Sequence, residues 1–399
     1  MRNPVAPLAL LLVAFAPAAA LGRALRVPDV FTPVLVEYLG DHTTPVKGTD
    51  GRWHVVYELW LSNARGVAAA VERIEVLDYD KPDRVLKTLE GADLVAVARD
   101  LAMKPLTDMA LEPNAAKIVF FELALDSKSD VPAAIVHRFT GSGAAGPAAQ
   151  TAGPLQYVVA PWDLNQPAPI AIGPPLRGKN WVAINGCCSL RGAHRGAVLP
   201  LDGELYDSQR FAIDWMRLDA KGDLLSGDPS RVESFFAYDQ PVLAIANATV
   251  IETLDGLDDQ VPGSLPDPAT ITVANVDGNH IILDLGKGLY AFYAHLKKGT
   301  LRVTKGDRVR LGQELARLGN TGNTSAPHLH LQIMASPSAL AADGLPYVFT
   351  SFTLAGAMDK EQWYAPDSKL ADAYKIQDGD GRGPRRDELP LDLRIVDFP

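Results

Sequence analysis

Two histidines, separated by a single leucine, lie in an otherwise apolar stretch of the chain. The stretch APHLHLQI contains His328 and His330. In a β-strand, alternate side chains lie on the same face, so we expect both imidazoles to point in the same direction. Two imidazoles at this spacing can bind one metal ion, or one can bind it while the other transfers a proton beside it. The pair alone is a weak signal, and a metal site needs further donors.

Further donor side chains occur upstream of this pair. The segment LYAFYAHL carries His295 on an expected strand, and RFAIDWM carries Asp214 in an apolar one. A carboxylate in such a strand is costly to bury unless it is paired or coordinated. Together with the first pair, the candidate donors are His194, Asp214, His295, His328 and His330.

This set of donors is sufficient for a catalytic zinc site. Such a site takes three protein ligands from His, Asp and Glu and leaves one position for water. The metal lowers the pKa of that water and polarises the carbonyl to be cleaved, and a neighbouring unligated histidine can transfer the proton. No H-E-x-x-H motif is present in the sequence, which excludes the helical arrangement of zinc ligands.

Antiparallel strands are expected to position these donors. HIILDLGKGLYAFYAHL reads as two strands around a Gly-Lys-Gly turn, and LRVTKGDRVRLGQELARLG continues the pattern with further tight turns. We therefore expect residues 155–345 to form an antiparallel β domain that carries the site. Residues 346–399 are expected to be a C-terminal extension packed on this domain.

Residues 25–139 predict a separate accessory domain. Runs such as HVVYELWLSN and KIVFFELALD alternate polar and apolar residues, with turn-forming residues between the runs. This pattern is typical of an antiparallel sandwich, so we expect a mainly β chain that begins with an immunoglobulin-like β-sandwich. Residues 140–154 consist largely of Gly, Ala, Ser and Pro and predict a linker.

The N-terminus predicts export. Residues 1–22 contain Arg2, a short apolar run and then small residues, in the order of a secretory signal peptide. The apolar run is too short for a membrane span, and no later segment is long and apolar enough to be one. We therefore expect a periplasmic or secreted protein without stable membrane insertion after cleavage. Cys187 and Cys188 are adjacent, and the sequence is compatible with a vicinal disulfide, two thiols or an intermolecular link.

The segments YAHL and KGDRVRLGQELARLGNTGNTSAPHLHLQI resemble the lysostaphin-like, or LytM-type, zinc metallopeptidases, which are murein endopeptidases. That family has a Tyr-x-His-Leu strand followed by a Gly-x-Thr-Gly-x-Ser/Thr-x-x-Pro-His-Leu-His segment, and the order of motifs agrees over residues 199–334. The resemblance implies a small antiparallel β-sheet domain with a groove across it. It also implies that Asp214 and His330 are zinc ligands, and that His295 and His328 are an unligated catalytic pair.

One departure from the family pattern concerns the third zinc ligand. The family usually has a zinc-binding histidine four residues before the aspartate, but here that position is Arg210, and arginine stays protonated. We expect His194 to replace it, because this nearby upstream histidine could return to the site through a hairpin. The alternatives are His280 or a disabled site. For Arg210 itself, we expect structural pairing with a carboxylate rather than substrate binding.

Together, these features predict an exported zinc-dependent endopeptidase, with Zn²⁺ as cofactor, that hydrolyses peptide bonds in peptidoglycan or another peptide substrate. The net charge of −10 argues against a nucleic-acid partner, which requires a basic surface. The alternative is a catalytically inactive module of the same family that binds the cell wall or regulates other proteins. Arg210 is the reason to consider this alternative.

Overall fold

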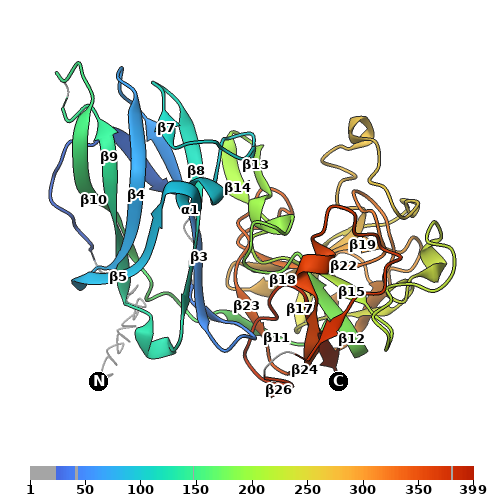
Figure 1. Ribbon diagram of the computed structural model, residues 1–399. Coiled ribbons are helices and arrows are strands. Elements are labelled where there is room, and N and C mark those ends of the chain that lie inside the picture. The colour runs from blue at the N-terminus through green and yellow to red at the C-terminus, as the bar shows by residue number, and fades with distance from the viewer. Residues whose placement is uncertain (1–23, 41–43, 147, 379–380) are drawn as a thin grey trace, which may run out of the picture.

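The computed structural model describes residues 24–40, 44–146, 148–378 and 381–399 (Figure 1). The predicted signal peptide, residues 1–22, lies outside the described residues. The chain is mainly β and antiparallel, as the alternating segments predict, with a sandwich followed by a second part built on a large sheet. In the part of the chain that is described, no helix is long and apolar enough to cross a membrane.

The N-terminal part is a sandwich of two antiparallel sheets, counted over the described residues. One sheet has the order β1-β3-β8-β6, with β2 beside β3, and the other has the order β10-β9-β4-β5, with β7 beside β4. Side chains from both sheets, among them Tyr57, Phe121 and Phe139, form one buried core between them. The elements are β1 Val34–Tyr38, β2 Val46–Lys47, β3 Trp53–Asn63, β4 Ala69–Asp78, β5 Lys81–Glu90, α1 Gly91–Ala96, β6 Ala98–Arg99, β7 Ala110–Leu111, β8 Ala116–Leu125, η1 Lys128–Asp130, β9 Ala134–Gly143 and β10 Gly153–Asp163.

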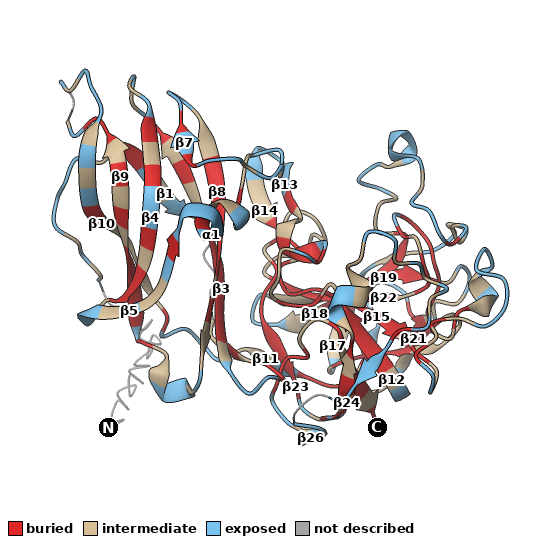
Figure 2. Cartoon of the chain, viewed as in Figure 1, coloured by how far each residue is buried: buried red, intermediate tan, exposed pale blue. Residues whose placement is uncertain are grey.

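Strand β3 is buried on both faces, unlike an ordinary outer strand of a sandwich. Its Tyr57 and Leu59 belong to the sandwich core, whereas Val56 packs in the core of the C-terminal part. Glu58, on the same face as Val56, is also fully buried. Figure 2 shows β3 at the centre of the molecule, next to the C-terminal part. The two parts therefore share buried surface along this strand.

The C-terminal part is built on a sheet of eleven strands within the described residues. Their order is β20-β17-β18-β19-β22-β15-β12-β27-β24-β25, with β26 beside β24. The strands of this sheet are β12 Gly178–Ile184, β15 Ile213–Arg217, β17 Ala248–Leu254, β18 Asn279–Gly286, β19 Leu289–Leu296, β20 Arg308–Val309, β22 Leu329–Met334, β24 Phe352–Met358, β25 Ile376–Gln377, β26 Gly383–Arg385 and β27 Arg394–Phe398. Trp181, Trp215 and Tyr293 lie in its core.

Shorter elements complete this part. They are the strand pairs β11 Ile170–Ile172 with β23 Tyr347–Phe349, β13 Val198–Leu201 with β14 Glu204–Asp207, and β16 Pro241–Leu243 with β21 Glu314–Arg317, and the helical turns η2 His194–Gly196, η3 Val232–Ser234, η4 Pro268–Thr270 and α2 Lys360–Trp363. In the segment between β12 and η2, Cys187 and Cys188 form a disulfide.

The boundary between the two parts lies later than the sequence predicts. Residues 140–154 are not a linker, because β9 extends to Gly143, β10 begins at Gly153, and the two strands pair as a hairpin. Residues 155–163 therefore belong to the sandwich rather than to the second domain. Gly, Ser and Pro suit the end of a hairpin as well as a linker, so their presence does not distinguish the two.

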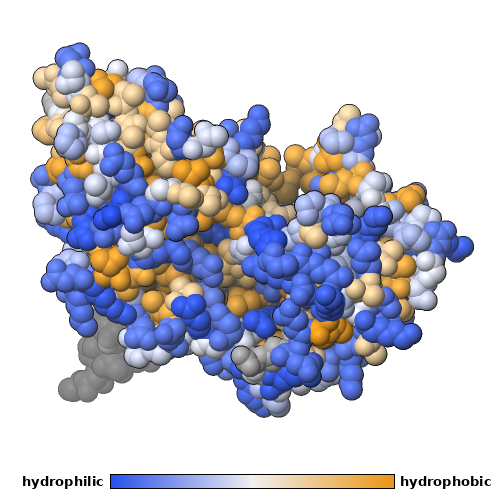
Figure 3. Space-filling model, viewed as in Figure 1, coloured by the Kyte–Doolittle hydropathy of each residue, from blue (hydrophilic) through white to orange (hydrophobic). Residues whose placement is uncertain are grey.

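The C-terminal residues 346–399 are not a peripheral extension. Strand β27 lies between β12 and β24 in the large sheet, so the end of the chain completes the core of the C-terminal part. The same segment reaches the sandwich, where Nζ of Lys47 lies 2.8 Å from a carboxylate oxygen of Glu388. Figure 3 shows that the visible face is hollowed between the two parts, with hydrophobic side chains beside hydrophilic ones.

Candidate metal centre

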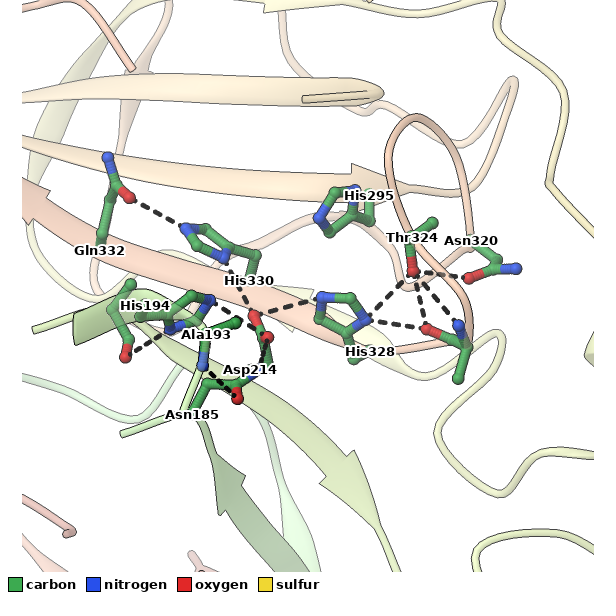
Figure 4. A network of polar contacts seen from close by, with 12 residues as sticks. Asn185, Ala193, His194, Asp214, His295, Asn320, Thr324, His328, His330 and Gln332 are labelled. Atoms are coloured by element: carbon green, nitrogen blue, oxygen red, sulfur yellow. Dashed lines mark hydrogen bonds and ion pairs between the residues drawn. The ribbon is translucent and has the colours of Figure 1, made fainter. Parts of the chain in front are cut away.

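Three neighbouring strands and one turn bring the candidate donors together (Figure 4). Asp214 on β15 lies directly opposite His330 on β22. Strand β19 pairs with the other edge of β22 and carries His295 near its end, while His328 immediately precedes β22. His194 comes from the turn η2. Both imidazoles of the HLH segment lie on the site side of the sheet, as strand alternation predicts.

Asp214 faces three of the histidines, His194, His328 and His330. Its Oδ2 atom is 3.2 Å from Nε2 of His194, and its Oδ1 atom is 2.9 Å from Nδ1 of His330. The imidazole rings of His194 and His330 are edge to face, with centroids 4.8 Å apart. One possible ligand atom from each of His194, Asp214 and His330 lies within 4.8 Å of the others. Two imidazoles and a carboxylate that converge in this way correspond to the ligand set of a catalytic zinc site.

The outer hydrogen bonds of both imidazoles determine which ring nitrogen faces Asp214. Nδ1 of His194 donates to the carbonyl oxygen of Ala212, at 3.0 Å, which leaves the lone pair on Nε2. Nε2 of His330 donates to Oε1 of Gln332, at 2.9 Å, which leaves the lone pair on Nδ1. Such outer partners orient metal-binding histidines and select their tautomer. Both lone pairs are therefore directed at the carboxylate of Asp214.

Asp214 is buried, yet its surroundings favour the charged form. Burial raises the pKa of this carboxyl group, but His194 and His328 outweigh the effect and hold its pKa well below the usual range. Asn185 donates a further hydrogen bond of 2.8 Å to Oδ2. Imidazole lone pairs that face an ionised carboxylate repel it unless a proton or a cation lies between them. The donor set therefore fits a divalent cation such as Zn²⁺.

His295 and His328 lie beside this group, and Nε2 of His328 is 3.2 Å from Oδ1 of Asp214. Nδ1 of His295 donates to the carbonyl oxygen of Thr321 at 2.7 Å, and Nδ1 of His328 donates to that of Ala326 at 2.8 Å. The two rings have centroids 4.7 Å apart. Burial, together with His328 and His330, holds the pKa of His295 well below its usual value, so that the ring is neutral at pH 7.

The backbone at His295 is also unusual. Its φ angle is 60°, in the left-handed region that non-glycine residues rarely adopt. Two backbone hydrogen bonds hold this conformation. The N–H of His295 donates to the carbonyl oxygen of Asp277, and the carbonyl oxygen of His295 accepts from the N–H of Gly319. Strained conformations of this kind concentrate at functional sites.

A second possible ligand group shares one member with the first. His295, His328 and His330 also have ligand atoms within 4.8 Å of one another. We favour the group that contains Asp214, because a divalent cation is bound more strongly next to an ionised carboxylate than among three neutral imidazoles. In the second group, moreover, the buried charge of Asp214 would be left outside the coordination shell.

His280 and Arg210, which the sequence also suggested as residues near the metal, lie outside the centre. His280 does not join the centre, because its Nε2 atom faces Glu252 at 3.3 Å. Arg210 does not contact the aspartate of the centre either. Its guanidinium group pairs with Glu58 and Asp207, so it takes the structural role expected for it, with carboxylates outside the centre.

Sequence reasoning missed two residues that support the centre. Gln332 lies on the same strand face as His328 and His330, so the alternation in HLHLQ could have identified it. Its amide is itself oriented, because Nε2 donates to the carbonyl oxygen of Ala339 at 3.0 Å. Asn185 follows β12 in a loop, where the sequence has no periodic signal that could have identified it.

One family model matches part of the chain. Residues 232–342 match the model of peptidase family M23. This range contains His295, His328 and His330, whereas His194 and Asp214 lie upstream of it.

Two relatives share part of this sequence. The peptidoglycan DD-endopeptidase ShyA of Vibrio cholerae is 29% identical over 156 residues, which cover 36% of this chain and 33% of that protein. The glycyl-glycine endopeptidase ALE-1 of Staphylococcus capitis is 39% identical over 74 residues, which cover 18% of this chain and 20% of that protein. The chain therefore spans about a third and a fifth of the lengths of these relatives.

Among solved structures, the chain is similar to the catalytic domain of lysostaphin from Staphylococcus simulans. The two are 24% identical, and the match covers 37% of this chain and 80% of the lysostaphin chain. A zinc-containing peptidase from Vibrio cholerae is 14% identical to this chain, and the match covers 78% of this chain and 86% of the peptidase. The TM-scores are 0.22 and 0.20, too low for either match to carry an argument.

Proposed function

We propose that this chain, whose residues 232–342 match the model of peptidase family M23, is an exported zinc-dependent endopeptidase that hydrolyses peptide bonds in peptidoglycan. The observation that carries the proposal is the convergence of His194, Asp214 and His330 on one point, with correctly directed lone pairs. Export is inferred from the signal-like residues 1–22. The choice of substrate follows the names of the two relatives.

The chain's own residues have separate tasks in this proposal. His194, Asp214 and His330 would hold the zinc ion, which when bound polarises a carbonyl group and lowers the pKa of water. His295 is neutral and presents Nε2, so it can accept a proton from a water molecule in the site. Because Nδ1 of His328 donates to Ala326, its Nε2 atom can donate only when the ring is protonated. Burial lowers the pKa of His328, but Asp214 outweighs this effect and raises it, which favours the protonated form. The protonated ring can donate a hydrogen bond to the carbonyl oxygen that becomes negatively charged.

A hydrolysis assay on isolated sacculi tests this proposal. The two relatives are named for different bonds, so the assay should include sacculi with direct cross-links and sacculi with oligoglycine cross-bridges. We expect soluble fragments with new free amino groups from at least one substrate. A chelator should abolish their release, and added zinc should restore it. Asp214→Asn is the matched control, because it preserves side-chain size but removes the charge needed for the metal.

A binding or regulatory module is the second candidate. Two observations favour it: Arg210 occupies the position of the usual zinc-binding histidine, and the side chains of His194, Asp214, His328 and His330 are at most 12% exposed. Such a module would bind sacculi tightly without releasing any fragments. Sedimentation of the protein with sacculi, combined with the hydrolysis assay, distinguishes the two functions.

A further inference from the structure

Four buried charged side chains join the two parts of the chain beside the candidate metal centre. They are Glu58 from the sandwich and Arg195, Asp207 and Arg210 from the C-terminal part, and none is more than 2% exposed. We propose that Glu58 is a positioning residue for the metal ligand His194 and acts through Arg195. The proposal rests on the metal site of the proposed function and assigns a role in that site to the N-terminal sandwich.

Arg195 directly follows His194 and fastens its turn to the sandwich. Nη1 of Arg195 donates a hydrogen bond to a carboxylate oxygen of Glu58. Nη2 donates hydrogen bonds of 3.2 Å to the carbonyl oxygens of Tyr57 on β3 and Phe121 on β8. A planar guanidinium group with several donors can satisfy such a set of acceptors simultaneously. The turn that carries His194 is therefore attached to two strands of the sandwich.

His194 needs this attachment more than the other two candidate ligands do. Asp214 and His330 are strand residues that face each other through the pairing of β15 with β22. His194 instead lies in the segment 185–197, outside the strands that the structure describes. Its location is defined by individual contacts, such as the hydrogen bond to Ala212 and the neighbouring anchor at Arg195. A small displacement of that anchor would move the imidazole away from the two strand ligands.

Arg210 provides a second connection to the same carboxylate. Its Nη2 atom lies 2.6 Å from Oε2 of Glu58 and donates to the carbonyl oxygen of Leu39 at 3.1 Å. Arg210 occupies the position where the resembling family has a zinc-binding histidine, four residues before Asp214. Glu58 therefore contacts both the turn that carries His194 and the segment that precedes Asp214.

The test is the zinc affinity of the full chain carrying Glu58→Gln. This substitution keeps the shape of the side chain but removes the charge that faces two guanidinium groups. We expect zinc to bind about 10–100-fold more weakly in a competition titration with a chelating dye, as for other residues that orient ligands. The visible absorption spectrum of the Co²⁺-substituted protein should also change, because it reports on the ligands around the metal.

Two further variants separate positioning from a general loss of stability. Ile74→Ala removes buried core volume from the opposite sheet of the sandwich, so it should destabilise the sandwich but leave zinc affinity and the Co²⁺ spectrum unchanged. Arg195→Lys keeps the positive charge but loses the forked contacts to β3 and β8, so it should weaken zinc binding even if Glu58→Gln does not fold.

The possible outcomes distinguish this proposal from the proposed function. The positioning role would be overturned if folded Glu58→Gln or Arg195→Lys bound zinc as tightly as the parent and had an unchanged Co²⁺ spectrum. The proposed function would be unaffected by that result. Equal weakening by Ile74→Ala would also overturn the positioning role, because the effect would then follow stability. A parent protein that binds no zinc would overturn the proposed function and this proposal together.

Discussion

Nδ1 of His330, rather than Nε2, faces Asp214, and it lies 2.9 Å from Oδ1. This orientation is set two residues further along the same strand, where Gln332 accepts a hydrogen bond from Nε2. Strand alternation therefore supplies both a candidate ligand and the residue that orients it. The first prediction follows from this relationship.

Gln332→Leu should weaken zinc binding by about 10–100-fold, because Leu has a similar size but cannot accept the proton of His330 Nε2. The dissociation constant for zinc is the quantity to measure. Gln156→Leu, on the exposed side of β10 in the sandwich, is the matched control and should bind zinc like the parent. Equal affinities for all three proteins would show that Gln332 does not orient the ligand.

His295→Ala should separate catalysis from metal binding. We expect kcat to fall by about 10²–10⁴-fold, the usual contribution of a group that transfers a proton, while zinc content stays at the parent level. The two measurements are peptide hydrolysis and metal analysis of the same preparation. If zinc were lost as well, His295 would belong to the coordination shell, and the group formed by His295, His328 and His330 would be the preferred site.

The stability of the sandwich should depend on the ionisation of His54. Burial lowers the pKa of this imidazole, but hydrogen bonds to Asp50 and Glu122 outweigh the effect and raise it to about 9. Because the folded pKa lies above the unfolded value of about 6.5, the stabilisation is complete below pH 6.5 and is lost as the pH rises through 9.

Urea unfolding of the parent and of His54→Gln checks this dependence. With excess chelator present, the difference in free energy of unfolding between the two proteins should decrease by at most about 3 kcal/mol between pH 6 and pH 10. A difference that stays constant over this range would mean that the ion pairs of His54 do not contribute to stability.

Local patterns were sufficient to predict the strands and most of the candidate centre. The HLH segment and LYAFYAHL place His295, His328 and His330 on adjacent strands, and Asp214 stands out as a carboxylate in an apolar strand. The sequence indicates His194 less directly. It is the nearby upstream histidine, and Arg210 occupies the position where the resembling family has its zinc-binding histidine. The structure brings these five side chains together.

Long-range pairing was not visible in the sequence. The segment 140–154 has the composition of a linker, and only the pairing of β9 with β10 shows that it is a hairpin. Strand β27 joins β12 from more than two hundred residues away, so no local pattern could have placed it in the large sheet. The contact of Glu58 with Arg195 likewise joins two segments that are 137 residues apart.

Zinc content per chain, measured for the parent, His194→Ala and His280→Ala, tests the central claim most directly. We predict about one zinc ion in the parent and in His280→Ala, and almost none in His194→Ala, because His194 faces Asp214 whereas His280 faces Glu252. Equal zinc in all three proteins would contradict His194 as a ligand. No zinc in the parent, even after reconstitution, would contradict the proposal of a zinc enzyme.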